Sequence, residues 1–511
     1  MSRVRALREH PWTVAFAAVS LLLVLLHLVA LNTSPPGLYN DEASIGYNAW
    51  AVAHHGIDEH GARLPLFFEA FGEYKNPVYV YTLAPFTWVL PLTPYVVRLP
   101  AALFGLLTCA AAAMLAWQLT RSRLVTMLTL ATAGMTPWLV QESRLGFEVI
   151  SGVALLMLGL WFLARATERD STRWFVWAGV VLALSIFAYT TLRAFAAGMV
   201  VALALAFLLP GARRLTHWAW TLPPMLVGYA VLLVYGILTP GALTARFSII
   251  GIGYDSPGAA TLVGRFVANY VTYWGFQFLA IHGDDNLRHH TGFGGELMAV
   301  TLPAIAVGAV ICVRRMRRDR FCRVLVIGAL GAPVPAALTY EGTPHSLRAA
   351  LMLPFLLAFS VYGWQAIAGL LTARRLVALS VAAAVAVEGG GYFHDMYVQY
   401  PGRAVTAFDT GEGPAIDRAA QLAGGHQVLL STNLDSAYIQ ALFYLRPDPH
   451  DYVREGLAAL HMRAEAPDEV TLDAQPGDLM VLAPFDPIPD GAQVLDVEPS
   501  QITPVAIVAR R

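Results

Sequence analysis

The sequence has little charge, few cysteines and almost no lysine. Only 14 % of its 511 residues are charged, whereas soluble domains carry roughly a quarter, and the mean hydropathy is +0.55. This composition excludes an ordinary soluble enzyme. The balance of 34 basic against 35 acidic residues lacks the basic excess of a nucleic-acid-binding domain. Three cysteines without a CxxC pair exclude a disulfide framework and a cysteine-built zinc site. We therefore expect the partner to be a membrane.

Long apolar segments recur from Pro11 to about Gly390. A membrane-spanning helix needs about 20 such residues, and the sequence predicts eleven spans, at 12–32, 96–119, 124–141, 148–165, 174–191, 194–210, 216–238, 296–313, 323–339, 349–371 and 375–391. The first resembles a signal peptide in its basic flank. Its apolar run is too long, however, and no small-residue cleavage site follows, so we expect an uncleaved anchor.

The arginines predict the orientation. Short basic segments, such as RSR at 121–123 and RRMRRDRFCR at 314–323, alternate with two long loops, 33–95 and 239–295, that contain few basic residues. The positive-inside rule then places the N-terminus in the cytoplasm and both long loops, which we name the first and second outer loops, outside. An odd number of spans puts residues 392–511 outside a cytoplasmic membrane.

The last 120 residues have a different character. A capped helix is predicted in GEGPAIDRAAQLAGG, a second helix in SAYIQALFYL, and strands in HQVLLSTN, DLMVLAPF and TPVAIVARR. The sequence therefore predicts two domains, a transmembrane catalytic domain over 1–391 and a small extracytoplasmic α/β domain over 392–511. The small domain contains no glycine-rich phosphate loop or nucleophile elbow, so we expect it to dock or to face an acceptor.

The first outer loop holds an acidic pair, Asp41 and Glu42, directly after a Pro-Pro-Gly turn and close to the end of the first span. A carboxylate at that depth can act on a group presented by a lipid. The pair also fits a structural interpretation, since acidic residues are favourable at the positive end of a helix dipole.

The motifs of this loop resemble those of a known superfamily. LYNDEASIGYNAWAV, then HGARLPLFFEAFGEYKNPVYVYTLAPF and VVRLPAALFGLLT, are similar in order and placement to the first luminal loop of the GT-C glycosyltransferases, nearest to family 39, with its protein mannosyltransferases, and its bacterial aminoarabinose transferase relatives. The resemblance is strongest over 36–166. It implies a polytopic helical GT-C fold, two juxtamembrane helices in this loop, Asp41 as catalytic base and Glu42 as a residue that shapes the site.

Cationic residues in the outer segments are candidates for binding the phosphate of a lipid-linked donor. Lys75 is the single lysine, in GEYKNP; Arg144 stands in QESRLGFE and Arg348 in TPHSLRA. Arginine offers bidentate contacts to phosphate, and lysine a point charge. Each of the three also fits a simpler interpretation as a residue snorkelling at the interface. The resemblance makes Glu148 a supporting residue that orients Arg144, and His345 is a second supporting candidate.

The second outer loop contains the segment HGDDNLRHH. Imidazole and carboxylate groups are suitable metal ligands, but the spacing of His282, Asp284, Asp285, His289 and His290 matches no established ligand motif. We therefore expect a polar loop that covers the donor pocket, with Asp284 and Asp285 as supporting residues, and neither a metal ion nor another cofactor.

Together these features predict an inverting glycosyltransferase that moves a sugar from a polyprenyl-phosphate donor to an extracytoplasmic protein, lipid or glycan acceptor. Three alternatives remain: a flippase or transporter for lipid-linked saccharides, a non-catalytic membrane scaffold, and a polymerase or ligase that uses a diphosphate-linked donor. A flippase typically carries functional charges in the middle of its spans and has discontinuous helices in repeated halves, whereas the polar residues here lie in asymmetric outer loops and no such halves are visible.

Overall fold

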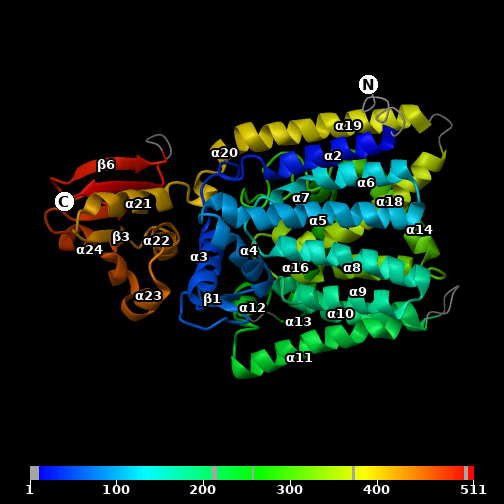
Figure 1. Ribbon diagram of the computed structural model, residues 1–511, viewed down its shortest axis with the longest axis horizontal. Coiled ribbons are helices and arrows are strands. Elements are labelled where there is room, and N and C mark those ends of the chain that lie inside the picture. Colours follow the sequence, from blue (N-terminus) through cyan, green and yellow to red (C-terminus); the bar gives the residue numbers. More distant parts are fainter. Residues whose placement is uncertain (1–10, 210–215, 256–257, 371–373, 500–503) are drawn as a thin grey trace. The chain divides into compact units, whose positions relative to one another are not determined.

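The computed structural model describes residues 11–209, 216–255, 258–370, 374–499 and 504–511 (Figure 1). The chain divides into two compact units, each assembled from distant segments. The bundle unit comprises 1–29, 101–144 and 148–395, and the loop-and-sheet unit comprises 30–100, 145–147 and 396–511. The basic segments at 1–10 and 211–214 and the first two residues of TARR at 372–375 lie outside the described residues.

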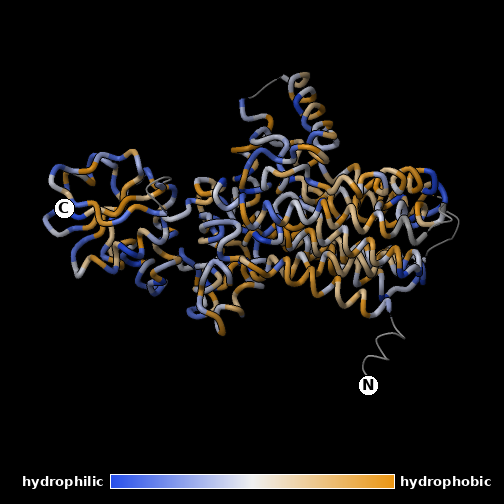
Figure 2. Tube along the Cα trace, turned by 90° about the horizontal axis from the view of Figure 1, so that it is seen from above, coloured by the Kyte–Doolittle hydropathy of each residue, from blue (hydrophilic) through white to orange (hydrophobic). Residues whose placement is uncertain are grey.

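The bundle unit is built from helices, most of them apolar along their length. Its helices are α2 (Pro11–Leu28), the main part of α5 (Pro94–Thr120), α6 (Arg123–Met135), α7 (Pro137–Glu142), α8 (Val149–Arg169), α9 (Thr172–Ser185), α10 (Thr190–Leu208), α11 (Leu222–Leu238), α12 (Ala245–Ile250), α13 (Ala259–Tyr273), α14 (Leu302–Arg315), α15 (Arg320–Gly331), α16 (Val334–Ala337), α17 (Ser346–Ala349), α18 (Leu353–Leu370) and α19 (Arg374–His394). Figure 2 shows their apolar lengths in orange and white, with hydrophilic residues in blue at the turns that connect them at one end.

Seven helical segments among the described residues are long and apolar enough to cross a membrane. They are Pro11–Leu28, Pro94–Thr120, Val149–Arg169, Thr190–Leu208, Trp218–Leu238, Arg320–Ala337 and Ser346–Gly369. Two further predicted spans, 124–141 and 174–191, contain the shorter apolar helices α6 and α9. The polytopic helical fold is confirmed, and the number of eleven spans stays a prediction.

Proline accounts for the break in the predicted span 124–141. Helix α6 ends at Met135, Thr136 is extended with φ −63° and ψ 123°, and Pro137 begins α7. A residue before proline avoids the helical region, and proline has no N–H to continue the helix. The segment is therefore two helices.

Two glycines allow α14 and α18 to approach closely. A Cβ at Gly308 would overlap the carbonyl oxygen of Phe359, and one at Gly363 would overlap that of Ala304. Small residues let helix backbones pack tightly where no water drives association. The contact between α14 and α18 therefore depends on both glycines.

The first part of the loop-and-sheet unit contains the two helices expected for the first outer loop, α3 (Asn40–His55) and α4 (Pro77–Val89). Between them lies an antiparallel hairpin of β1 (Phe68–Ala70) and β2 (Glu73–Lys75), which the sequence did not indicate. Lys75 ends β2, and Pro77 occupies the first position of α4, where its missing N–H costs nothing.

The C-terminal residues of this unit form a five-stranded sheet in the order β4-β3-β5-β7-β6. The sheet strands are β3 (Val428–Ser431), β4 (Met462–Glu465), β5 (Leu479–Leu482), β6 (Gln493–Glu498) and β7 (Ala506–Arg510), and the helices are α20 (Tyr400–Arg403), α21 (Glu412–Ala423), α22 (Ala437–Leu445), α23 (Pro449–Glu455) and α24 (Pro467–Asp473). Strand β3 is parallel to β4 and β5, and β7 is antiparallel to β5 and β6.

Alternating side chains place a core on each face of the sheet. Leu430 and Val481 pack with Ile416 of α21 on one face, while Leu429 and Met480 belong to the cluster on the other. This period of two is what an extended strand imposes. The predicted α/β character of the C-terminal residues is confirmed; β4, β6, α23 and α24 were not predicted.

Helix α22 packs against α3, so the first outer loop and the C-terminal residues share one compact unit. The amide of Gln440 donates to the carbonyl oxygen of Leu38 (2.8 Å) and to Oδ1 of Asn40 (3.0 Å). Asn40 in turn donates to the carbonyl oxygen of Asp435 (2.6 Å). The segment that carries the acidic pair is therefore held by residues that follow it in the sequence at separations of 395 to 402 positions.

Candidate functional site

Glu42 is a buried anchor in the loop-and-sheet unit. Its carboxylate and the guanidinium of Arg98 are both fully buried and form a bidentate pair, Nε to Oε1 at 2.8 Å and Nη2 to Oε2 at 2.7 Å. The backbone N–H of Gly146 also donates to Oε1 (2.8 Å), and that of Tyr39 to Oε2 (3.3 Å). Glu42 is therefore enclosed by protein groups, which favours a role in holding the start of α3.

Arg98 extends this anchor to the residues before α3. Its Nη1 donates to the carbonyl oxygens of Leu31 (2.8 Å) and Pro35 (2.7 Å), and its Nη2 to that of Gly37 (2.9 Å). Sequence reasoning missed Arg98. Its position in VVRLP, within an apolar segment, is the signal that could have found it, because a charge there is costly unless paired.

Asp41 is the accessible member of the acidic pair. It lies in the first turn of α3, its side chain is 36 % exposed, and it accepts a hydrogen bond from Nζ of Lys75. The side chain of Lys75 is only 6 % exposed, and its Nζ also contacts Glu73 (3.2 Å) and faces the Phe71 ring at 5.4 Å. The structure thus brings together the predicted base and the predicted lysine, with the carboxylate toward solvent and the cation behind it.

A second buried carboxylate, Glu59, contacts polar side chains of α3. Its Oε1 accepts from Asn48 (2.9 Å) and Ser44 (3.4 Å), and its backbone N–H donates to Asn48 (2.9 Å). Burial raises the pKa of Glu59 to about 7. Asn48 and Ser44 therefore tie the end of the loop at 56–59 to α3, and this tie includes a carboxyl group that titrates near neutrality.

In the bundle unit Arg348 is buried and bound. Its Nη2 pairs with Glu341 (2.8 Å), and its Nη1 donates to the carbonyl oxygen of Glu341 (2.8 Å) and to Thr339 (3.1 Å). Burial acts to raise the pKa of Glu341, but the hydrogen bond and charge of Arg348 hold it below its ordinary value. Glu341 is 56 % exposed and Arg348 only 5 %, so a ligand phosphate would have to replace the glutamate.

Asp284, His289 and His345 form a compact polar cluster. Asp284 accepts from the backbone N–H of Ser346 (2.8 Å) and from Nδ1 of His289 (3.1 Å), and Nδ1 of His345 lies 3.9 Å from it. The two imidazole rings stack at 4.3 Å. Burial lowers the pKa of both histidines, and that of His345 most strongly. Neutral imidazoles and a carboxylate, with ligand atoms within 4.8 Å of one another, could hold a divalent cation.

Buried acids adjoin this cluster. Glu296 accepts from the hydroxyl of Ser346 and from the N–H of Asp284 (3.1 Å). Glu142 is fully buried, and neither carboxyl oxygen has a hydrogen-bond partner among the described residues. Burial, together with the charges of Glu296 and Asp284, raises the pKa of Glu142 well above its ordinary value. The surroundings of Glu142 therefore favour its protonated, uncharged form.

Two arginines of the second outer loop were not singled out by sequence reasoning. Arg246 and Arg288 act electrostatically on His345, in the same sense as Arg348. Arg246 is exposed and Arg288 half-buried, and the backbone carbonyl of Arg288 accepts from the buried amide of Gln141 (3.1 Å). Both residues are more exposed than Arg348.

Arg144 has a different environment from the one predicted. It is fully buried, and its guanidinium donates to the carbonyl oxygens of Leu26 (3.1 Å), His27 (3.4 Å) and Val29 (2.7 Å) at the end of α2. These contacts favour a structural role over the predicted phosphate contact. Glu148 is buried beside the charge of Arg193. Asp285 is exposed.

The predicted site residues thus fall into two groups. Asp41, Glu42 and Lys75 belong to the loop-and-sheet unit; Arg144, Glu148, Asp284, Asp285, His345 and Arg348 belong to the bundle unit. Within each unit the structure joins a part of the prediction, the Asp41–Lys75 pair in one and the Asp284–His345 cluster in the other. That the two groups serve one active site stays a prediction.

The chain is thus a helical membrane protein whose first outer loop carries the exposed acid Asp41 beside the buried Lys75. We compared it with known proteins on this basis. No protein-family model matches the sequence, and no curated protein matches it.

Solved structures do match. The aminoarabinose transferase ArnT from Cupriavidus metallidurans, bound to undecaprenyl phosphate, aligns with 98 % of this chain and 98 % of its own, with a TM-score of 0.62 and 15 % identity. The oligosaccharyltransferase of Archaeoglobus fulgidus, in complex with zinc and sulfate, aligns with 88 % of this chain and 62 % of its own, with a TM-score of 0.53 and 13 % identity. The same organism's AglB, with an inhibitory peptide and a dolichol-phosphate, aligns at a TM-score of 0.51 and 12 % identity, over 90 % of this chain and 65 % of its own.

These similarities establish the fold. The chain has the GT-C fold that its first outer loop suggested, and the match to ArnT extends through the C-terminal residues as well as the helical bundle.

Proposed function

We propose that the protein is an inverting glycosyltransferase of the cytoplasmic membrane that transfers a sugar from a polyprenyl-phosphate donor to an acceptor outside the cell. The observation that carries the proposal is the exposed Asp41 paired with the buried Lys75 at the start of α3, in a chain with the GT-C fold. Solved proteins with this fold include a transferase bound to undecaprenyl phosphate and one bound to a dolichol-phosphate, which supports a lipid-linked donor.

The chemistry requires one base and a site for the leaving phosphate. Asp41 accepts the proton of an acceptor hydroxyl or amine as the acceptor oxygen or nitrogen forms a bond to the anomeric carbon. The bond between that carbon and the phosphate oxygen breaks, and the electron pair leaves with the polyprenyl phosphate. Attack opposite the departing phosphate inverts the anomeric configuration, and binding both partners in line supplies much of the rate.

Cations receive the charge of the leaving group. Lys75 lies beside the base and supplies a point charge, while Arg246, Arg288 and Arg348 supply guanidinium groups in the bundle unit. Asp284, Asp285 and His345 are proposed to support the donor site. No step needs a metal ion, and we retain the prediction that none takes part. We also propose that the N-terminus lies inside the cell and the C-terminal residues outside, and that the sugar is a hexose or a pentose.

The test compares membranes that contain the native protein with membranes that contain Asp41→Asn, using a panel of radiolabelled polyprenyl-phosphate sugars and measuring label in envelope fractions. A general base contributes roughly a hundredfold to ten-thousandfold, so we expect transfer to fall by at least about a hundredfold at equal expression. Asp473→Asn, at an exposed position of the same unit, is the control and should transfer at the native rate.

Equal transfer by the native protein and Asp41→Asn would refute the assignment of the base. Consumption of no donor in the panel would count against the transferase and favour a flippase or a scaffold, and movement of the intact donor across the membrane would identify the flippase.

A further inference from the structure

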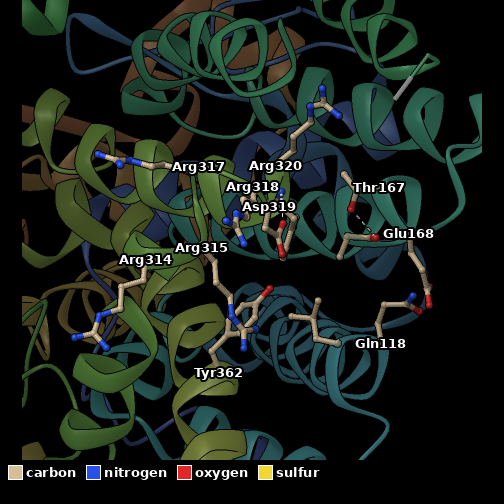
Figure 3. A pocket seen from close by; sticks show the side chains of 13 residues that line it. Gln118, Thr167, Glu168, Arg314, Arg315, Arg317, Arg318, Asp319, Arg320 and Tyr362 are labelled. Carbon is tan, nitrogen blue, oxygen red and sulfur yellow. Dashed lines mark hydrogen bonds between the residues drawn. The ribbon is translucent and has the colours of Figure 1, made fainter. Parts of the chain in front are cut away.

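A basic pocket lies within the bundle unit, at the ends of several apolar helices, and the proposed reaction does not use it. The cavity has a volume of about 830 Å³. It is formed by the last turns of α5 and α8, by the turn from α14 to α15, and by α18 (Figure 3). Its polar lining includes Gln118 and the arginines Arg314, Arg315, Arg317, Arg318 and Arg320.

The charge of this pocket is strongly unbalanced. Five arginines line it, against the two carboxylates of Asp319 and Glu168. Both acids already have partners: Asp319 caps α15 by accepting from the N–H groups of Phe321 (2.9 Å) and Cys322 (3.1 Å), and Glu168 pairs with Arg121 (3.2 Å), which is not part of the lining. Among the described residues, none of the five lining arginines is in an ion pair.

The turn that carries the arginines is held in place. Arg323 donates from Nε to the carbonyl oxygen of Met316 (2.9 Å) and from Nη2 to that of Arg317 (3.1 Å). Its Nη1 donates to the carbonyl oxygen of Ala206 in α10 (2.7 Å). The basic turn is thus tied to a neighbouring helix, so less conformational entropy is lost when it binds a ligand.

The opposite wall offers donors without acceptors. Gln118 is buried, with 6 % of its surface exposed, and its Nε2 has no hydrogen-bond partner among the described residues, while its Oε1 accepts from Arg165 (3.0 Å). On the basic turn itself, Nε and Nη1 of Arg320 are also buried without a partner among the described residues. In Figure 3, Gln118 and Glu168 stand on one side of the view, and Arg314 and Arg317 on the other. Unsatisfied buried donors of this kind indicate a missing acceptor.

We infer that this pocket binds the phosphate group of an anionic phospholipid from the surrounding bilayer. Its depth supports a lipid rather than a soluble ligand, because it lies where spanning segments end or begin, at Thr120, Arg169 and Arg320. Headgroup phosphates of the adjacent leaflet lie at this level, and basic pockets between membrane helices are suited to them. The guanidinium groups bind the phosphate, and the apolar side chains on the same helices pack against the acyl chains.

The inference is tested by native mass spectrometry of the purified full-length protein in a neutral detergent, titrated with phosphatidylglycerol or with phosphatidylcholine. We expect the native protein to retain phosphatidylglycerol adducts preferentially. Each basic residue near an anionic membrane surface contributes roughly a factor of five in affinity, so the double variant Arg315→Gln/Arg318→Gln should bind phosphatidylglycerol about 30-fold more weakly.

The control variant is Arg169→Gln/Arg173→Gln, which removes the same charge from exposed arginines at the turn between α8 and α9, outside the pocket. It should keep the native preference. A melting temperature equal to that of the native protein in lipid-free detergent shows that each variant is folded; if the pocket double variant is unfolded, the single change Gln118→Leu replaces it and should weaken phosphatidylglycerol binding without altering phosphatidylcholine binding.

Three results would overturn the inference. The first is equal phosphatidylglycerol binding by the native protein and the pocket variant, and the second is an equal loss of binding in the control variant. The third is displacement of phosphatidylglycerol by glycerol 3-phosphate at matched concentration, which would assign the pocket to a soluble phosphate ester. None of these results bears on Asp41 or on sugar transfer, so this proposal and the proposed function fail independently.

Discussion

The buried Glu42–Arg98 pair makes the start of α3 vulnerable to a single substitution. Arg98→Met would remove all five hydrogen bonds that the guanidinium makes, two to Glu42 and three to the carbonyl oxygens of Leu31, Pro35 and Gly37. The carboxylate of Glu42 would remain, fully buried, with only backbone N–H groups as partners. Removing one partner of a buried pair costs about 3–5 kcal/mol, because the other charge is left uncompensated.

A double variant separates the charge from the packing. In Arg98→Met/Glu42→Leu no buried charge is left, and apolar replacement of a buried ion pair is often close to neutral. The three carbonyl groups and the N–H groups of Gly146 and Tyr39 still lose their partner. We therefore expect the double variant to be less stable than the native protein, yet more stable than Arg98→Met, with a coupling of about 1–3 kcal/mol between the two positions.

Unfolding in mixed micelles, driven by a denaturing detergent, measures these differences. Arg63→Met, at an exposed position of the same unit, is the matched control and should change stability by less than about 0.5 kcal/mol. If Arg98→Met is as stable as this control, or if Glu42→Leu fails to compensate it, the pair does not hold the start of α3 and the reasoning is wrong.

Three further predictions concern the site. Lys75→Gln should lower kcat/KM for the lipid-linked donor by about tenfold to a hundredfold, since a charge-assisted hydrogen bond contributes roughly 1.5–3 kcal/mol; native initial rates would refute a role in phosphate binding. Burial raises the pKa of Glu59 from 4.5 to about 7, so the folded state holds this proton more tightly and stability should fall by about 3 kcal/mol as pH rises from 4.5 through 7. Melting curves across that range should show the slope in the native protein and lose it in Glu59→Gln, and an unchanged slope would contradict the assignment. Transfer should survive dialysis against a chelator. A metal at the Asp284 cluster would be established by two results together: dialysis abolishes activity and zinc restores it, and the native protein contains metal whereas His345→Ala does not.

Local composition was enough to predict much of the architecture. The apolar content of α5, α8 and α18 exceeds what a soluble domain tolerates, so each reads as a spanning helix without any knowledge of its neighbours. The strands β3 and β5 and the helices α21 and α22 follow from short-range periodicity in the same way. The hairpin β1–β2 did not, because three-residue strands are defined by their pairing and not by a pattern of their own.

The candidate site was predicted only in part, for a related reason. The resemblance of the first outer loop pointed to Asp41 and Lys75, and the structure pairs them. It also led to the expectation that Arg144 would bind phosphate, whereas burial against the end of α2 gives its guanidinium backbone partners. A sequence shows that an arginine is present, but not whether its donors are already used.

By itself, then, the sequence determined that this is a polytopic helical membrane protein with an α/β C-terminal part, because hydropathy and periodicity act over a few turns. Tertiary structure alone decided that Arg98 would bind Glu42, 56 residues away, and that Gln440 would donate to Asn40 across 400 residues. It also decided that Arg348 would form an ion pair with Glu341. These pairings depend on which polar groups are buried beside one another, and that is determined only when distant segments of the chain pack together.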